Sequence, residues 1–308
     1  MLACGYRPIQ AFVAMYQGAF GGARQVTETF VKTCPLLLTG LAVAFAFRCG
    51  VWNIGAEGQY LIGTFIATWL GTSITRLPPL FFIPLILTAG FVGGGVWAAI
   101  AGLLKAYRGV QEVISTIMLN FIALELVRYA VDRGPLQEAT HSYQQSERLA
   151  TNALLPHLLP KSWIPSNRFH LGIILALIIS VCLYWLLFRT TVGYQVRAVG
   201  QNPVAARVAG ISVSRNIILA MLISGGLAGL AGTIELTGLS PHRLYQNAPG
   251  YGYTAIAVAL LGRLHPIGVI FSATLFGSLQ AGSEEMQMVA QVPSKLTWVT
   301  QATVLLLV

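Results

Sequence analysis

The polar groups best able to act on a small molecule are gathered in the stretch GVWNIGAEGQ at residues 50–59, between two apolar segments. Its three glycines weaken a helix, and irregular backbone at membrane depth is tolerated only where protein or a water-filled cavity surrounds it. Amide, carboxylate and indole groups can hold a polar, ring-containing solute, and here they belong to Trp52, Asn53, Glu57 and Gln59. A loop at the membrane surface with Trp52 at the interface explains the same pattern, and spacing does not separate the two interpretations.

A second group of polar side chains follows in the apolar segment 111–131. Thr116 and Asn120 are four residues apart, so a helix places them on one face. Glu125 and Arg128 are three residues apart and can neutralise each other. Although an acid inside a membrane is by default a functional hypothesis, we interpret this pair as structural.

Recognisable catalytic constellations are absent from the sequence. There is no HExxH, no GxSxG and no GxxxxGK[ST], so the chain has no phosphate-binding loop of its own for ATP. The five histidines are isolated and the four cysteines lack CxxC spacing, so we predict neither a metal site nor a disulfide framework. The adjacent Glu284 and Glu285 point to different faces of a helix, and Glu235 stays open between a structural and a functional role. We therefore expect no resident cofactor.

A basic link at residues 189–215 carries four arginines and no acid. It contains a short predicted helix at 203–209, for which Asn202 is a good N-cap, Pro203 suits the first turn and Gly210 suits the position after the C-cap. The residues between these signals are small and apolar apart from one charge, and they include Ala205, Ala206, Arg207 and Ala209. Since a helix of two turns is not stable alone, it either docks in a groove of another protein or belongs to a loop that only orients the chain.

Composition indicates a membrane protein. Of the 308 residues 55% are hydrophobic and 9% are charged, whereas soluble domains are about 25% charged. The net charge of +9 would favour a nucleic-acid partner in a soluble protein. Here the basic residues lie mostly in links and helix ends, where membrane orientation and anionic lipid explain them, so we expect no nucleic acid. The predicted fold class is all-α and polytopic.

Hydropathy predicts eight membrane spans, preceded by a moderately apolar entry segment at 9–23. The ninth apolar element, 250–262, is shorter than the ~20 residues that a span needs, so it is either a broken crossing or a re-entrant half-helix. The predicted spans are 29–47, 60–75, 80–104, 111–131, 169–188, 216–237, 266–283 and 295–308.

Loop charge predicts the orientation. The link 189–215 has no acid, and Lys105 and Arg108 fall on the same side of the membrane by parity. The long polar stretch 132–168 balances its basic residues with acids. The positive-inside rule therefore places 189–215 in the cytoplasm and 132–168 outside.

Three stretches resemble the permease subunits of bacterial ABC importers, in the broad group that includes ribose and branched-chain amino acid permeases. They are GVWNIGAEGQYLIGT (50–64), GVQEVISTIMLNFIA (109–123) and GQNPVAARVAGISV (200–213). The strings NIGAEGQ and EVISTIMLN are similar to the nucleoside branch of that group. The resemblance runs from about Gly5 to Val308.

The resemblance implies a single transmembrane permease domain over 1–308 with about 8–10 helices, similar to the vitamin B12 importer type of permease fold. It implies a bacterial cytoplasmic membrane, a second permease subunit, an extracytoplasmic nucleoside-binding lipoprotein or periplasmic protein, and a separate ATPase subunit that holds ATP and Mg. Residues 200–213 match the segment that docks on the ATPase. The stretch 50–59 would lie beside the translocation pathway.

The apolar end of the chain and its start near the first helix lead us to expect that the natural protein continues at both ends. A sugar or a branched-chain amino acid remains an alternative cargo, and an ion-coupled secondary transporter or an integral membrane enzyme remains an alternative class.

Overall fold

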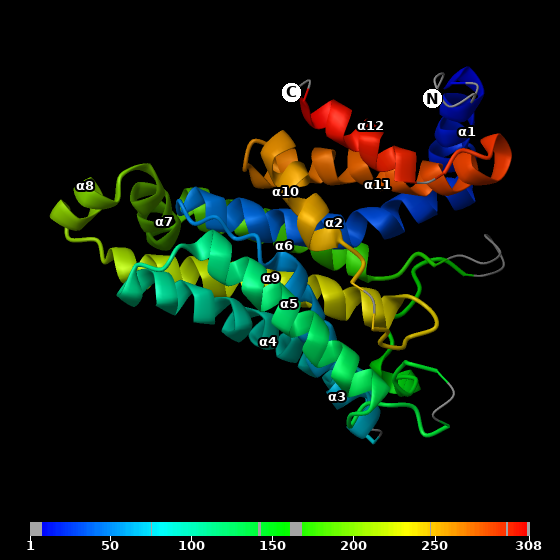
Figure 1. The fold of residues 1–308 in the computed structure, drawn as a ribbon, viewed down its shortest axis with the longest axis horizontal. Coiled ribbons are helices and arrows are strands. Elements are labelled where there is room, and N and C mark those ends of the chain that lie inside the picture. Colours follow the sequence, from blue (N-terminus) through cyan, green and yellow to red (C-terminus); the bar gives the residue numbers. More distant parts are fainter. Residues whose placement is uncertain are drawn as a thin grey trace.

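A computed structural model describes residues 8–74, 76–140, 143–160, 168–246, 248–293 and 295–306. These residues form an all-α fold, as the sequence predicts, joined by links that contain one short 3₁₀ helix and isolated bridges. Figure 1 shows most of the long helices running roughly along the long axis of the molecule. The helices are α1 (Pro8–Phe20), α2 (Ala23–Arg48), α3 (Ala56–Ser73), α4 (Pro79–Arg108), α5 (Glu112–Asp132), α6 (Gly172–Arg189), α7 (Thr191–Gln201), α8 (Pro203–Val208), α9 (Val213–Gly238), α10 (Tyr251–Leu261), α11 (Pro266–Ala290) and α12 (Lys295–Leu306).

Five of the described helices are long and apolar enough to cross a membrane, namely α2, α4, α5, α6 and α9. The chain is therefore a multi-pass membrane protein. Three of the eight predicted spans fall outside this set: α3, α11 and the 12 described residues of α12. Along α3 the buried positions include Glu57, Gln59 and several threonines, which lower its hydropathy.

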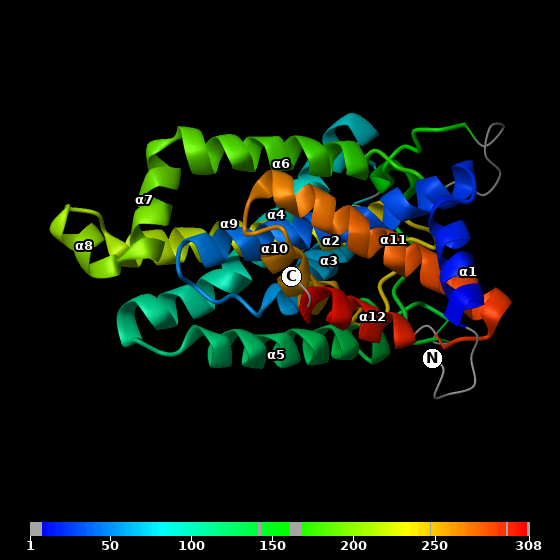
Figure 2. The same cartoon turned by 90° about the horizontal axis from the view of Figure 1, so that it is seen from above.

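The centre of the fold is α9, which is buried along most of its length against α2, α3 and α4. Figure 2 shows α6 along one side of the molecule and α5 along the other, with α2 and α9 between them. Small residues allow this close approach: a Cβ atom added at Gly94 of α4 would lie only 2.8 Å from the Cα atom of Gly229 on α9. Such contacts between backbones are typical of helix pairs in membranes.

Two sets of links gather at opposite ends of the molecule (Figures 1 and 2). At one end the connection between α4 and α5 lies near α7 and α8, and the Ser214 hydroxyl is 3.5 Å from the Ala106 carbonyl. At the other end the segments 143–160 and 237–246 are joined by backbone hydrogen bonds, such as Ser146 N–H to Leu244 O at 2.9 Å. This separation confirms that Lys105, Arg108 and the basic link share one end. Residues 141–142 and 161–167 of the predicted outer loop lie outside the described residues.

The short element 250–262 is a broken crossing. Residues 248–250 are non-helical, and α10 then runs toward the last residues of α2. There the Arg48 guanidinium Nε–H donates to the Leu264 carbonyl at 2.9 Å, beside the last residues of α2. From this point α11 returns, so the structure decides between the two alternatives that the sequence left open.

Candidate functional site: polar network, outer cavity and coupling end

Asn53 is the centre of a buried polar network at the start of α3. Its side chain is fully buried and forms a reciprocal amide pair with Gln59, with N···O distances of 2.9 and 3.0 Å. Its amide also donates to the Ser224 hydroxyl at 2.8 Å, and that hydroxyl donates to the Ala42 carbonyl at 2.6 Å. The network therefore fastens the irregular stretch 50–55 to α9 and α2. Buried amides are tolerated here because their hydrogen bonds are made.

Asn120 joins the same stretch to α5. Its side-chain oxygen accepts a hydrogen bond from the Gly58 amide at 2.8 Å, and its nitrogen donates to the Ile54 carbonyl at 2.9 Å. Thr116 lies one turn earlier and is also buried, with its hydroxyl donating to the Glu112 carbonyl at 2.7 Å. The prediction that Thr116 and Asn120 share a face is confirmed, and that face packs against α3.

Glu57 connects α3 to the broken crossing. Its carboxylate accepts hydrogen bonds from the amides of Gly250 at 2.7 Å and Gly252 at 2.6 Å, where α10 begins. The first amides of a helix have no partner inside the helix, and a carboxylate at this end is favourable for both the amides and the helix dipole. Glu57 is therefore the cap that fixes the start of α10.

Trp52 differs from the other predicted pathway residues because 52% of its surface is exposed. Its ring packs on Phe47, with 4.6 Å between the ring centroids, and its backbone amide donates to Glu112 at 3.2 Å. Asn53, Glu57, Gln59, Thr116 and Asn120 use their polar groups inside the protein. Their place beside a translocation pathway stays a prediction.

The Glu125–Arg128 pair forms as predicted, with 2.8 Å between the guanidinium Nη1 and the carboxylate Oε1. Both side chains are largely exposed on α5, on the face that turns away from the bundle. The pair neutralises itself, which is consistent with a structural interpretation.

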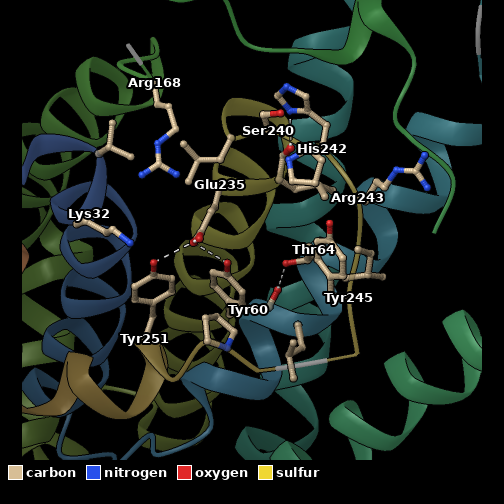
Figure 3. A pocket seen from close by; sticks show the side chains of 17 residues that line it. Lys32, Tyr60, Thr64, Arg168, Glu235, Ser240, His242, Arg243, Tyr245 and Tyr251 are labelled. Atoms are coloured by element: carbon tan, nitrogen blue, oxygen red, sulfur yellow. Dashed lines mark hydrogen bonds between the residues drawn. The ribbon is translucent and has the colours of Figure 1, made fainter. Parts of the chain in front are cut away.

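A cavity of about 300 Å³ is lined by residues 239–245 among others, and Figure 3 shows the side chains around it. We call it the outer cavity because it lies at the end that loop charge predicts to face outside. Glu235 of α9 points into this cavity, where it accepts hydrogen bonds from the hydroxyls of Tyr60 at 2.7 Å and Tyr251 at 3.3 Å. The sequence left the role of Glu235 undecided between structural and functional, and it did not single out the two tyrosines. The sequence did contain a signal for these tyrosines, because a tyrosine in an apolar segment needs a partner for its hydroxyl.

The cations around this cavity are held by acids from other elements. Each of the three lies on a different part of the cavity wall (Figure 3). The pairs are Lys32–Glu284 at 2.9 Å, Arg168–Glu28 with Nε–Oε1 at 3.0 Å, and Arg243–Glu138 at 2.6 Å. The Arg243 and Gln145 hydrogen bonds also lower the pKa of the Glu138 carboxyl, with that of Gln145 the larger effect.

His170 packs beside the cavity, between the outer links and the start of α6. Its ring is 2% exposed, and its Nδ1 accepts a hydrogen bond from the Gly172 amide at 3.1 Å. Burial, with smaller electrostatic contributions from His157 and His242, lowers the pKa of His170 to about 4. The ring is therefore neutral at physiological pH.

The opposite end carries the predicted short helix, α8. The Asn202 side chain accepts hydrogen bonds from the amides of Val204 and Ala205, both at 3.0 Å, Pro203 occupies the first turn, and Gly210 has a φ of +80°. The predicted boundary signals are thus confirmed. The sequence did not predict the preceding α7, which starts where the Thr190 hydroxyl accepts from the Gly193 amide at 3.1 Å.

The structure shows which residues of α8 face inward and which face outward. Ala206 is buried against the rest of the protein, because it is the one residue of α8 that faces inward. Val204 and Val208 are 70% and 86% exposed, although both are apolar. Arg207, Ala205, Ala209 and Gly210 are exposed beside them. The outward surface is therefore a pair of valines next to one arginine.

The family described as branched-chain amino acid transport system / permease component matches residues 25–308. The chain belongs to this permease family.

Three curated relatives cover almost all of this permease. It is 39% identical to the guanosine ABC transporter permease protein NupP of Bacillus subtilis, over 100% of its own length and 87% of the relative. It is 36% identical to the nucleoside ABC transporter permease protein NupB of Lactococcus lactis, over 99% and 84%. It is 34% identical to the glucose ABC transporter permease protein TsgB13 of Haloferax volcanii, over 99% and 81%. No solved structure is significantly similar to it.

Proposed function

We propose that this permease is the membrane subunit of an ABC importer that moves nucleosides into the cytoplasm. A separate ATPase subunit holds ATP and Mg and drives alternating access. The partners are a second permease subunit, similar or identical, and an extracytoplasmic nucleoside-binding lipoprotein or periplasmic protein. The site of action is the bacterial cytoplasmic membrane.

The observation that carries this proposal is the identity of 39% and 36% with two permeases named for guanosine and nucleoside transport, over nearly the whole chain. The end of the molecule that holds α7 and α8, which we call the coupling end, supports the same function. Val204 and Val208 expose apolar surface beside Arg207 outside the apolar bundle, and exposed apolar side chains of this kind favour a protein partner. In this proposal α8 is the element that an ATPase subunit moves.

The polar network takes the role of pathway wall. Asn53, Gln59, Thr116 and Asn120 hold the irregular stretch in place, Glu57 holds the start of α10, and Trp52 offers an exposed ring. In this proposal a movement of the coupling end is transmitted to the pathway wall through Arg48, because Arg48 contacts the link between α10 and α11.

The test is uptake of radiolabelled guanosine by cells that carry the complete transporter, comparing wild type with Arg207→Glu and Val208→Glu. Both variants put an acid on the exposed surface of α8. We expect each to reach the membrane, to lose co-purification with the ATPase and to lose at least nine-tenths of the uptake. The matched control is Arg133→Glu, a charge reversal at the opposite end, where the side chain is 85% exposed.

Each possible result distinguishes the proposed function from one alternative. Unchanged uptake in both α8 variants would remove the coupling role. Uptake that survives ATP depletion but collapses with the ion gradient would identify a secondary transporter instead. Uptake of glucose without guanosine would favour a sugar importer, the second candidate supported by the 34% identical glucose permease.

A further inference from the structure

We propose that the outer cavity is a solute-binding site inside a single permease chain, and that it takes a neutral solute with hydroxyl donors and a planar ring. This inference rests on the proposed function, under which the solute is a nucleoside. The cavity opens at the end that holds the segments 143–160 and 237–246, where a solute arriving from outside would enter.

The floor of the cavity supplies the hydrogen-bond acceptor. Tyr60 donates to one oxygen of Glu235 and Tyr251 donates to the other, so each carboxylate oxygen is oriented by one hydroxyl. A carboxylate has about four lone-pair sites, and two are therefore left for donors from a solute. Two neighbouring sugar hydroxyls can donate to both free positions.

The charges around the cavity argue for a neutral solute. Lys32, Arg168 and Arg243 each lie within 3.0 Å of a partner acid, so none is a spare cation for a phosphate or carboxylate. His242 is committed to the Leu236 carbonyl through its Nδ1, at 3.1 Å. A nucleotide would bring negative charge toward Glu235, and the described residues that line the cavity offer no unpaired cation to receive it.

The rings and the volume set the size and shape of the solute. The rings of Tyr60 and Tyr251 lie 6.0 Å apart at 56°, with both hydroxyls directed at Glu235 (Figure 3). Tyr245 lines the cavity on another side. Tyr245 is 42% exposed, so its ring is available for contact with a planar base. A cavity of about 300 Å³ is at the small end of the range for small-molecule sites, which suits one small solute.

The experiment measures equilibrium binding of tritiated guanosine to the purified permease–ATPase complex, with the receptor omitted so that its own site does not contribute. We expect saturable binding by wild type, at least tenfold weaker binding by Glu235→Gln, and weaker binding by Tyr245→Ala. Glu125→Gln is the matched control, since it neutralises an acid on the exposed face of α5 and should bind as wild type does. Tyr245→Ala keeps the test valid if Glu235→Gln fails to fold.

Binding that is absent in wild type, or equal in wild type and both cavity variants, overturns the site. Competition by glucose as effective as competition by unlabelled guanosine overturns the requirement for a ring. Uptake in cells is measured separately. If cells take up guanosine but binding does not depend on the cavity residues, the proposed function stands and this site is refuted. If binding depends on Glu235 but cells take up no guanosine, the site is supported and the proposed function is refuted.

Discussion

The carboxylate of Glu57 accepts a hydrogen bond from the backbone amide of Gly252 at 2.6 Å, so the first turn of α3 holds the first turn of α10. The two residues are far apart in the sequence, and a second amide, that of Gly250, reinforces the contact at 2.7 Å. No side chain at the N-cap position of α10 caps this helix. The broken crossing therefore begins at a charged cap that another helix supplies.

Glu57→Gln should loosen the start of α10. The amide side chain has one acceptor and two donors, so it can satisfy only one of the two backbone amides without a clash of donors. We expect a loss of about 2 kcal/mol in unfolding free energy, the usual size for a lost hydrogen bond to a charged group. Hydrogen exchange at 250–254 should rise in Glu57→Gln and stay unchanged in Glu125→Gln. Equal protection in both variants would contradict the capping role.

The amide pair of Asn53 and Gln59 should show strong coupling. Asn53→Leu leaves the buried Gln59 amide without its partner and should cost about 1 to 3 kcal/mol. Replacing both residues by leucine removes the stranded group, so the double variant should cost less than the sum of the two single variants. Chemical unfolding in detergent measures all four proteins, and additive losses would argue against a shared network.

Gly229→Ala should disrupt the centre of the bundle. A methyl group at this position would meet the backbone of Gly90 and Gly94 on α4, which cannot move as the end of a side chain can. We expect a loss of about 3 kcal/mol or failure to assemble, since overpacking a tight core costs about 1 to 3 kcal/mol even where side chains can yield. Thermal melting of the purified protein checks this. Gly22→Ala is the control, because only the flexible side chain of Gln25 lies close by, and an equal loss in both variants would refute the explanation.

The buried His170 should make stability fall in mild acid. Its pKa is lowered from 6.5 to about 4 in the folded protein, so below pH 6.5 the unfolded chain binds a proton that the folded chain does not. Stability then declines as the pH falls from 6.5 toward 4, by about 2 kcal/mol between pH 7.5 and pH 5. His170→Asn keeps an acceptor for the Gly172 amide without titrating, so its melting temperature should fall less over this interval. His242, whose pKa is also lowered, contributes equally to both proteins, and identical pH dependence would disprove the assignment to His170.

Features that depend on local chemistry are predictable from the sequence alone. Apolar length specifies the spanning helices, because backbone groups in lipid must be satisfied within their own segment. The short helix α8 was predicted with its boundaries, since Asn202, Pro203 and Gly210 act on the backbone next to them. The shared face of Thr116 and Asn120 also follows from helical spacing alone.

Contacts between distant groups depend instead on how the helices pack. Glu57 could not be identified as the cap of α10, nor Glu235 as the partner of two tyrosines, because each contact joins helices whose relative placement depends on packing around α9. The inward direction of Ala206 and the broken crossing at 250–262 have the same origin. The periodicity of the sequence shows on which face of a helix a side chain lies. The packing of the whole bundle determines which element that face contacts.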